Sequence, residues 1–446
     1  MKTRNALSRR EFLAGSAGLA AGMPALNAAE TQVPATVPIT ASRLALNGGP
    51  KAVTLAPKLG KRWGEPERER LNGLISQDTL FYWKGPQTTQ FVERFKQICP
   101  LEYVMPCSSG TAALHIAVLA AGVGLGDEVI TAPITDIGTV IGVLYQQGIP
   151  VFADLKSNSY NLDPTDVARR ITPRTKAIIA VHLCGNPCQL RELRALSDQH
   201  GLVLIEDCAQ AWGARYQGHP IGTIGHIACF SLQNSKHITC GDGGVVASSD
   251  KRFGPVLQKF GDKGYDRTHG GLFEVIAPNY RMTEAQAAIA GAQLDRLENI
   301  VRRRSELGNL MTQKLGGIRG IHPHAVDERD RCGYWFYFLR LDPRKLQCDR
   351  AEFVKALVAE GVEAGAGYIA VPLHRNPVFL KHGFFSGRWP VKEMGLTTMD
   401  YSKHETPEAE AILKTGVRLT IHEGMSEEYV LSAAEAVRKV AAHYAG

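Results

Sequence analysis

The sequence predicts an α/β protein with a mostly parallel β-sheet, followed by a smaller C-terminal α+β domain. The chain has 446 residues, of which 44% are hydrophobic, enough for a large core and more than one domain. From about residue 100, short apolar runs alternate with stretches long enough for crossover helices, as in parallel α/β sheets. This pattern changes after about residue 310, so we expect a large domain at 44–310 and a small one at 311–446.

The large domain contains apolar and β-branched runs that are typical of buried strands. We expect these strands at 103–106, 129–132, 151–153, 177–183, 202–205 and 227–232. Crossover helices are expected at 137–146, 166–171 and 189–200. Because strand, helix and strand follow one another repeatedly, most of the sheet should be parallel.

Helix signals continue towards the C-terminus. Thr283 and Gln286 form a capping box for a helix that we expect to end at the three arginines 302–304. The small domain should contain a strand, a helix and a final amphipathic helix, at 334–341, at 350–360 and after Ser426.

The composition excludes several classes of protein. Residues 1–28 supply +3 of the formal net charge of +7, and +4 spread over the remainder is too weak for nucleic-acid binding. A mean hydropathy of −0.13 excludes a polytopic membrane protein, and no stable membrane span is expected after processing. The nine cysteines show no CxxC spacing, so we expect no metal site, and their pairing stays open. The triplet His322-Pro323-His324 is expected to be a surface turn rather than a metal site.

The N-terminus resembles a twin-arginine export signal. Arg9 and Arg10 precede a glycine-rich, moderately apolar run, and small residues follow at Ala28 and Ala29. Residues 1–28 are therefore expected to be a signal peptide and residues 29–43 a linker, which places the mature protein in the periplasm. A signal that is not used, and a cytoplasmic protein, is the alternative.

Four segments carry residues suited to chemistry, and the first is the run of small residues at 108–114. It lies between the expected strand 103–106 and an apolar helix. The free N–H groups at such a helix start, together with the positive end of the helix dipole, form a seat for phosphate. The same residues also fit a plain tight turn.

The second segment is the end of the expected strand 202–205, which continues into Glu206 and Asp207. Carboxylates at this position lie at the carboxyl edge of a parallel sheet, where open α/β sheets bind ligands. Side chains alternate along a strand, so Glu206 and Asp207 should point to opposite faces, and only one of them into the crevice. A carboxylate that caps the next helix is the alternative.

The third segment is the loop that carries Lys236 after the expected strand 227–232, followed by the glycine-rich run 241–244. Burial of this lysine would lower its pKa and make its amine nucleophilic, as Schiff-base chemistry requires. A lysine that reaches solvent from the loop is the alternative. The fourth segment, at 279–282, offers polar groups just before the capped helix, and it also fits a solvated loop.

Together, a phosphate seat, a strand-end carboxylate and a loop lysine match the needs of pyridoxal 5′-phosphate. The chain resembles the DegT/DnrJ/StrS sugar aminotransferases, a branch of the fold-type I pyridoxal-phosphate enzymes, and this implies their mostly parallel seven-stranded sheet. The resemblance extends from about Leu44 to the last helix. It is carried by the motifs at 44–50, 126–130, 206–211, 230–231, 243–244 and 279–281.

This resemblance implies roles for individual residues. Lys236 would bind the aldehyde of the cofactor and then shuttle protons, and Asp207 would keep the pyridine nitrogen protonated. Gln210 would contact the 3-oxygen of the ring. The residues implied to hold the phosphate are Gly110, Thr111 and Ser231, together with Asn279 from the neighbouring subunit of a homodimer.

The chain departs from the family at one position. Members commonly place an aromatic residue over the pyridine ring, whereas this chain has Asp136 there, in the run Pro133-Ile134-Thr135-Asp136. Ring stacking is therefore not expected at this position. A second carboxylate near the cofactor should alter the preference for donor or acceptor, and an inositol ketone or aminocyclitol is one such acceptor.

The expected reaction moves an amino group from glutamate or glutamine to a keto sugar or a keto-cyclitol. Two alternatives stay open: a sugar dehydratase, which in this family carries His in place of Lys236, and a non-catalytic binding or regulatory protein. The presence of all four cofactor segments argues against the second of these. Nucleotide sugars are cytoplasmic, so export would favour a free or glycan-linked keto sugar, or a cyclitol.

Overall fold

The computed structural model describes residues 43–446 of the chain. The expected signal peptide (1–28) and all but the last residue of the expected linker (29–43) lie outside the described residues. Within 43–446, no helix is both long and apolar enough to cross a membrane.

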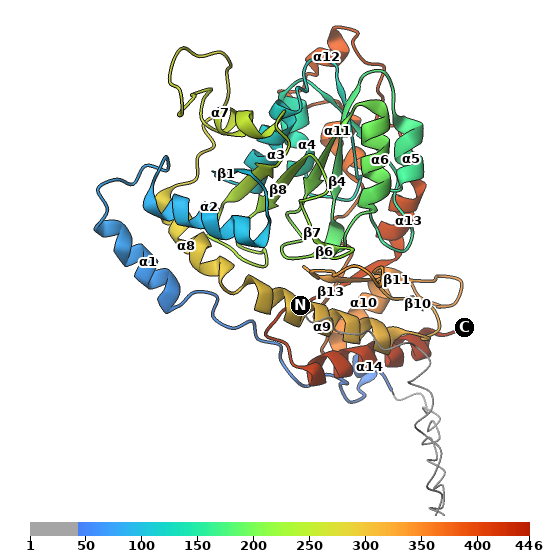
Figure 1. Ribbon diagram of the computed structural model, residues 1–446. Helices are drawn as coiled ribbons and strands as arrows, with labels where there is room; N and C mark the ends of the chain where they lie inside the picture. The colour runs from blue at the N-terminus through green and yellow to red at the C-terminus, as the bar shows by residue number, and fades with distance from the viewer. Residues whose placement is uncertain (1–42) are drawn as a thin grey trace, which may run out of the picture. The chain divides into compact units, whose positions relative to one another are not determined.

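A seven-stranded sheet forms the centre of the structure (Figure 1). The strand order is β1-β9-β8-β5-β4-β2-β3, and only β9 runs antiparallel to its neighbours, so the expected mostly parallel sheet is confirmed. The strands are β1 (Tyr103–Cys107), β2 (Glu128–Thr131), β3 (Ile149–Phe152), β4 (Thr175–Val181), β5 (Val203–Asp207), β8 (Ile227–Ser231) and β9 (Gly244–Ser248), with a small hairpin of β6 (Arg215–Tyr216) and β7 (His219–Pro220).

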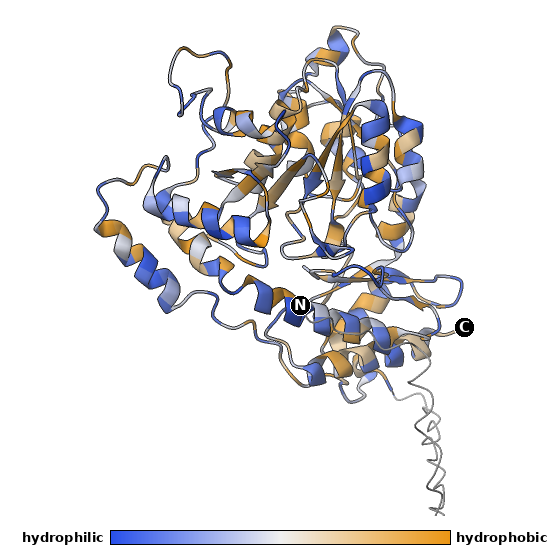
Figure 2. Ribbon diagram, in the orientation of Figure 1, coloured by the Kyte–Doolittle hydropathy of each residue, from blue (hydrophilic) through white to orange (hydrophobic). Residues whose placement is uncertain are grey.

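Helices cover both faces of this sheet, as right-handed crossovers require. Figure 1 shows α3 (Gly110–Ala120) and α4 (Gly138–Tyr145) on one side, and α5 (Pro164–Arg170) and α6 (Leu190–His200) on the other. The strands are mainly orange in Figure 2, in keeping with their burial on both faces. The other elements of this part are η1 (Ala45–Asn47), α1 (Glu65–Ile75), α2 (Pro86–Ile98), η2 (Leu183–Gly185), η3 (Gly254–Val256) and α7 (Leu257–Gly261).

A second, four-stranded antiparallel sheet has the order β10-β11-β13-β12. Its hydrophobic cluster also takes in Leu44 and Val53, and residue 310 lies inside a helix, so the division into two domains at 310 stays a prediction. The elements are β10 (Ile321–His322), β11 (Tyr337–Leu341), α10 (Arg350–Ala359), β12 (Ala364–Ala366), η4 (Leu373–Arg375), α11 (Pro377–Leu380), α12 (Pro390–Glu393), α13 (Pro407–Thr415), β13 (Gly416–Leu419) and α14 (Glu427–Tyr444).

The helix expected at 283–304 is in fact two helices, α8 (Glu284–Leu294) and α9 (Leu297–Leu315). The capping box at its start is confirmed, since Thr283 Oγ1 accepts a hydrogen bond from the Gln286 N–H at 3.3 Å. The expected end at 302–304 is wrong. Arg304 is buried in the middle of α9, where its Nε donates to Glu423 at 2.8 Å, so its charge is held by an ion pair rather than by a helix end.

The triplet at 322–324 is only partly the expected surface turn. His322 is exposed, but His324 is fully buried among the rings of Tyr160, Tyr334 and Tyr337. Burial lowers the pKa of His324 to about 3, so this side chain is a neutral core residue.

Candidate active site

A cavity of about 300 Å³ opens at the carboxyl edge of the large sheet. The ends of β5 and β8, the start of α3 and the loop before α4 all contribute to its wall. Five of the seven expected cofactor residues line it, namely Gly110, Thr111, Asp207, Ser231 and Lys236. Asp136 lines it as well.

Lys236 lies in the loop that follows β8 and is 9% exposed. Its Nζ is 3.8 Å from the ring centroid of Trp335, which comes from the segment just before β11. Burial lowers the pKa of the amine to about 8, and the nearby carboxylates of Asp207 and Asp136 oppose this shift. Near pH 8 a large share of the amine is therefore neutral and able to act as a nucleophile or base.

Asp207 and Glu206 point to opposite faces of the sheet, as strand alternation predicts. Asp207 lies in the cavity, where its Oδ2 accepts from the Thr139 hydroxyl at 2.9 Å and its Oδ1 from the Ala209 N–H at 3.1 Å. Burial raises the pKa of Asp207, and these hydrogen bonds oppose the increase. Each oxygen accepts one bond from the protein, which leaves lone pairs for a donor in the cavity.

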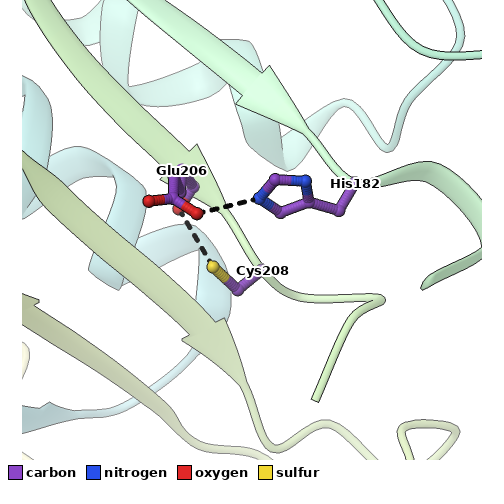
Figure 3. A group of neighbouring side chains, drawn as sticks. All are labelled: His182, Glu206 and Cys208. Atoms are coloured by element: carbon purple, nitrogen blue, oxygen red, sulfur yellow. Dashed lines mark hydrogen bonds and ion pairs between the residues drawn. The ribbon is translucent and has the colours of Figure 1, made fainter. Parts of the chain in front are cut away.

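Behind the strand, Glu206, His182 and Cys208 form a buried group that could be taken for a metal site (Figure 3). Each ligand atom is already engaged. His182 Nε2 lies 3.2 Å from Glu206 Oε2, and its Nδ1 accepts from the Cys188 N–H at 3.0 Å. Burial would raise the pKa of Glu206, but hydrogen bonds from His182 and two backbone N–H groups hold it below the usual value. The group therefore acts as a structural network.

The small-residue run places a helix start at the cavity. Ser109 is the N-cap of α3, and its Oγ accepts from the Ala112 N–H at 3.0 Å, while the first N–H groups of a helix have no partner within it. A Cβ at Gly110 would lie 2.7 Å from the Cβ of Ser231, so only glycine allows this close approach. The result is a seat for an anion between Gly110, Thr111 and Ser231.

Two expected cofactor residues do not line the cavity. Gln210 accepts from the Cys184 N–H at 2.9 Å and donates to the Tyr368 hydroxyl at 3.3 Å, so it contacts a cavity residue but not the cavity. Asn279 is exposed and pairs with Asp262 in an isolated β-bridge, away from the cavity of its own chain.

Three residues at the site, Thr139, Trp335 and Tyr368, were not predicted from the sequence. Thr139 follows Asp136 in the first turn of α4, and no spacing rule indicates a contact with Asp207. Trp335 and Tyr368 come from the C-terminal part of the chain, and their rings pack edge to face at 5.7 Å. The aromatic run around Trp335 predicts only a strand, because an inward-facing aromatic residue is usually part of a core.

The cavity fits pyridoxal 5′-phosphate. This cofactor needs an anion seat, a carboxylate near its ring nitrogen and an amine for its aldehyde. Gly110 with Ser231, Asp207 and Lys236 supply these three groups in one cavity.

Comparison with known proteins gives a consistent result. The sequence profile of the DegT/DnrJ/EryC1/StrS aminotransferase family matches residues 63–438. GDP-perosamine synthase of Escherichia coli O157:H7 is 30% identical over 373 residues, covering 84% of this chain and 95% of that protein. A putative L-glutamine:3-amino-2,3-dideoxy-scyllo-inosose aminotransferase of Micromonospora echinospora is 34% identical over 346 residues, covering 76% and 82%.

Solved structures agree with this. The crystal structure of 3-amino-5-hydroxybenzoic acid synthase has a TM-score of 0.76 at 27% identity, covering 87% of this chain and all of that one. Fold, cavity and sequence therefore lead to one conclusion: the chain belongs to the DegT/DnrJ/EryC1/StrS aminotransferase family and is a pyridoxal 5′-phosphate-dependent aminotransferase.

Proposed function

We propose that the enzyme transfers an amino group from glutamate or glutamine to the carbonyl carbon of a keto sugar or a keto-cyclitol. The observation that carries the proposal is the buried amine of Lys236 in one cavity with Asp207 and the anion seat. Relatives named as a perosamine synthase and as an inosose aminotransferase support both classes of acceptor.

Different residues of the chain have different roles in this reaction. When bound, pyridoxal 5′-phosphate supplies an electrophilic aldehyde and an electron sink. Lys236, with a pKa of about 8, holds the cofactor and then carries a proton to and from the substrate carbon. Asp207 keeps the ring nitrogen protonated, and Thr139 and Ala209 hold its carboxylate in place. Gln210 holds the Tyr368 hydroxyl at the wall of the cavity.

Reduction with borohydride tests this function. Purified protein should carry a bound chromophore that borohydride fixes on Lys236, located by peptide mass spectrometry. Lys236→Ala should fold normally, lack the chromophore and lose transamination with glutamine or glutamate and a panel of keto sugars and inosose. Wild-type turnover in Lys236→Ala would refute the assignment. A chromophore without any transamination would favour the dehydratase or the regulatory protein.

We also propose that the enzyme is a homodimer in which Asn279 completes the site of the neighbouring subunit. Asn279 is exposed and absent from the cavity of its own chain. It directly follows the segment 263–278, in which Leu272 is 94% and Ile276 95% exposed. Large apolar side chains exposed together in this way are typical of a surface that a partner covers.

Subunit mixing tests the dimer. Lys236→Ala and Asn279→Ala should each be nearly inactive, but a hybrid dimer has one site with both residues intact. An equal mixture, unfolded and refolded together, should regain about a quarter of wild-type activity, because about half of the dimers are hybrids. A mixture no more active than its components, or a monomer by sedimentation, would contradict the proposal.

We further propose that the enzyme is exported in folded form by the twin-arginine route. All nine cysteines are free, and eight are buried. A chain that folded in an oxidising compartment would expose these thiols to wrong disulfides, whereas folding in the reducing cytoplasm encloses eight of them first. Replacement of Arg9 and Arg10 by Lys should retain full-length, cofactor-loaded enzyme in the cytoplasm. Native enzyme that is cytoplasmic and still begins at Met1 would exclude export.

A further inference from the structure

The backbone of the lysine loop is held by side chains from outside the loop. Arg62 lies in the extended segment before α1, and its guanidinium donates hydrogen bonds to the carbonyl oxygens of Asn234, Lys236 and His237, the last at 3.0 Å. The carbonyl between them, that of Ser235, accepts from Trp335 Nε1 at 2.7 Å. Four consecutive carbonyls around the catalytic lysine are thus bound by only two distant side chains.

Arg62 is itself fixed in place. Its own carbonyl accepts hydrogen bonds from Gln293 Nε2, at 2.8 Å, and from the Arg296 guanidinium. Gln293 belongs to α8, and Arg296 directly precedes α9. The same two side chains donate to Glu67 Oε1, at 2.7 Å and 3.0 Å. Arg62 forms no ion pair with any residue in 43–446, so its hydrogen-bonding capacity goes to the loop.

The chemistry of the side chain suits this task. A guanidinium is planar and has five N–H donors in a fixed arrangement, so one arginine can satisfy several carbonyls at once. An ammonium carries three donors on one nitrogen and cannot reach the same spread of acceptors. Without Arg62, the carbonyls of Asn234, Lys236 and His237 would lose this donor, and the contacts to the last two are partly buried. Of the four consecutive carbonyls, only that of Ser235 would keep a hydrogen bond from a side chain outside the loop.

We propose that Arg62 is a positioning residue for transamination: it fixes the backbone of 234–237 so that the Lys236 amine stays in the cavity beside the Trp335 ring. The inference rests on the proposed role of Lys236. Arg62 does not line the active-site cavity, so it would act through the loop. Reactions in which the amine must return to the same point in every cycle are sensitive to displacements of about 1 Å.

Two variants and a matched control test the proposal. Arg62→Ala and Arg62→Lys remove all or part of the contacts. Arg62 and Arg303 both line a second cavity of about 410 Å³, separate from the active-site cavity. Arg303→Ala therefore removes the same charge from the same surroundings, but Arg303 donates to Glu427 and the Met425 carbonyl and not to the loop. Hydrogen–deuterium exchange of peptides spanning 232–240 is measured on the cofactor-free proteins, so this readout does not depend on the reaction. Steady-state kinetics then separate kcat from KM.

We expect Arg62→Ala to exchange the 232–240 amides at least about tenfold faster and to lose kcat on the order of 100-fold, with the donor KM within about twofold. Arg62→Lys should fall between Arg62→Ala and wild type, and it serves alone if Arg62→Ala does not fold. Exchange and kcat equal to those of Arg303→Ala would overturn the proposal. Such a result would leave the borohydride test of Lys236 untouched, so the two failures are distinguishable.

Discussion

At the scale of single residues, two carboxylates influence the charge of the Lys236 amine. Asp207 and Asp136 both stabilise the charged form of Lys236, against the burial that lowers its pKa to about 8. With Asp207 in its proposed role at the ring nitrogen of the cofactor, Asp136 would be the acidic partner left for the amine. An aspartate where the resemblance implies an aromatic residue would therefore change the charge of the site as well as its shape.

Asp136→Asn should lower the pKa of Lys236 below its value of about 8, because the variant removes a negative charge that favours the ammonium form. The measurement is the pH dependence of Lys236 acylation in the cofactor-free protein, followed by mass spectrometry. Asp163→Asn, at the partly exposed N-cap of α5 and outside the cavity wall, is the control and should leave the pKa unchanged. An unchanged pKa in Asp136→Asn would show that Asp136 does not act on the amine.

Variants of the neighbouring residues Glu206 and Asp207 should affect different properties, the first the stability of the protein and the second its catalysis. Asp207→Asn should lower kcat on the order of 100-fold or more, because the ring nitrogen loses its counter-charge, with little effect on unfolding. Glu206→Gln should lower the free energy of unfolding by about 1–3 kcal/mol and leave kcat nearly unchanged, since it weakens only the buried network with His182 and backbone N–H groups. Urea titration and steady-state kinetics on both variants provide the check, and the reverse pattern would contradict these roles.

At the scale of elements, the sequence predicted the strands and helices that have a clear hydrophobic periodicity or a capping motif. The buried parallel strands were visible as apolar runs, and their carboxyl ends already indicated Asp207 and the loop of Lys236. It did not predict β9, because the strand begins with Gly244, the last residue of the glycine-rich run 241–244, which indicates a loop. Nor did it predict Arg62 or Trp335 at the lysine loop, because these contacts arise only when distant segments pack together.

Two glycines, Gly110 at the start of α3 and Gly73 in α1, should respond in opposite ways to replacement by alanine. Gly110→Ala should weaken cofactor binding at least about tenfold, because its Cβ would lie 2.7 Å from that of Ser231 and force the anion seat apart. Gly73→Ala, in the exposed part of α1 with open space around the new Cβ, should instead raise the free energy of unfolding by about 0.5–1 kcal/mol. Fluorescence titration with the cofactor and urea unfolding measure the two effects. Equal cofactor affinity in both variants would be inconsistent with the seat.

At the scale of the whole chain, one buried carboxylate joins the start of the described chain to its last helix. Glu360 accepts from the backbone N–H groups of Ala45 and Ala52, at 2.8 Å and 2.9 Å, and from Lys439 Nζ at 2.9 Å. Lys439 also donates to the Pro50 carbonyl at 2.7 Å. Burial would raise the pKa of Glu360, but these hydrogen bonds hold it below the usual value.

Glu360→Gln should lower the free energy of unfolding by about 3–5 kcal/mol, because it leaves Lys439 buried without a counter-charge. The depressed pKa of Glu360 adds stability above the pKa of the unfolded carboxyl, and this stability is lost as the pH falls through the folded value. Glu435→Gln, in an exposed pair on α14, is the control and should cost less than about 1 kcal/mol. Urea titrations at neutral and acidic pH compare the two variants, and equal losses would contradict the role of Glu360.

The pairing of β1 with β9 also bears on how the molecule assembles. Tyr103 lies opposite Ser248, and β9 is the only neighbour of β1 in the sheet. β1 therefore has no strand to pair with until about 140 further residues have been synthesised and β9 has folded. Closing so long a loop is entropically costly, and contacts of this kind slow folding. Because Ser109 follows β1 and Ser231 belongs to β8, the two sides of the anion seat meet only at this late step. In pulse-labelling exchange, the amides of β1 should gain protection no earlier than those of β9, and cofactor capture should wait for both.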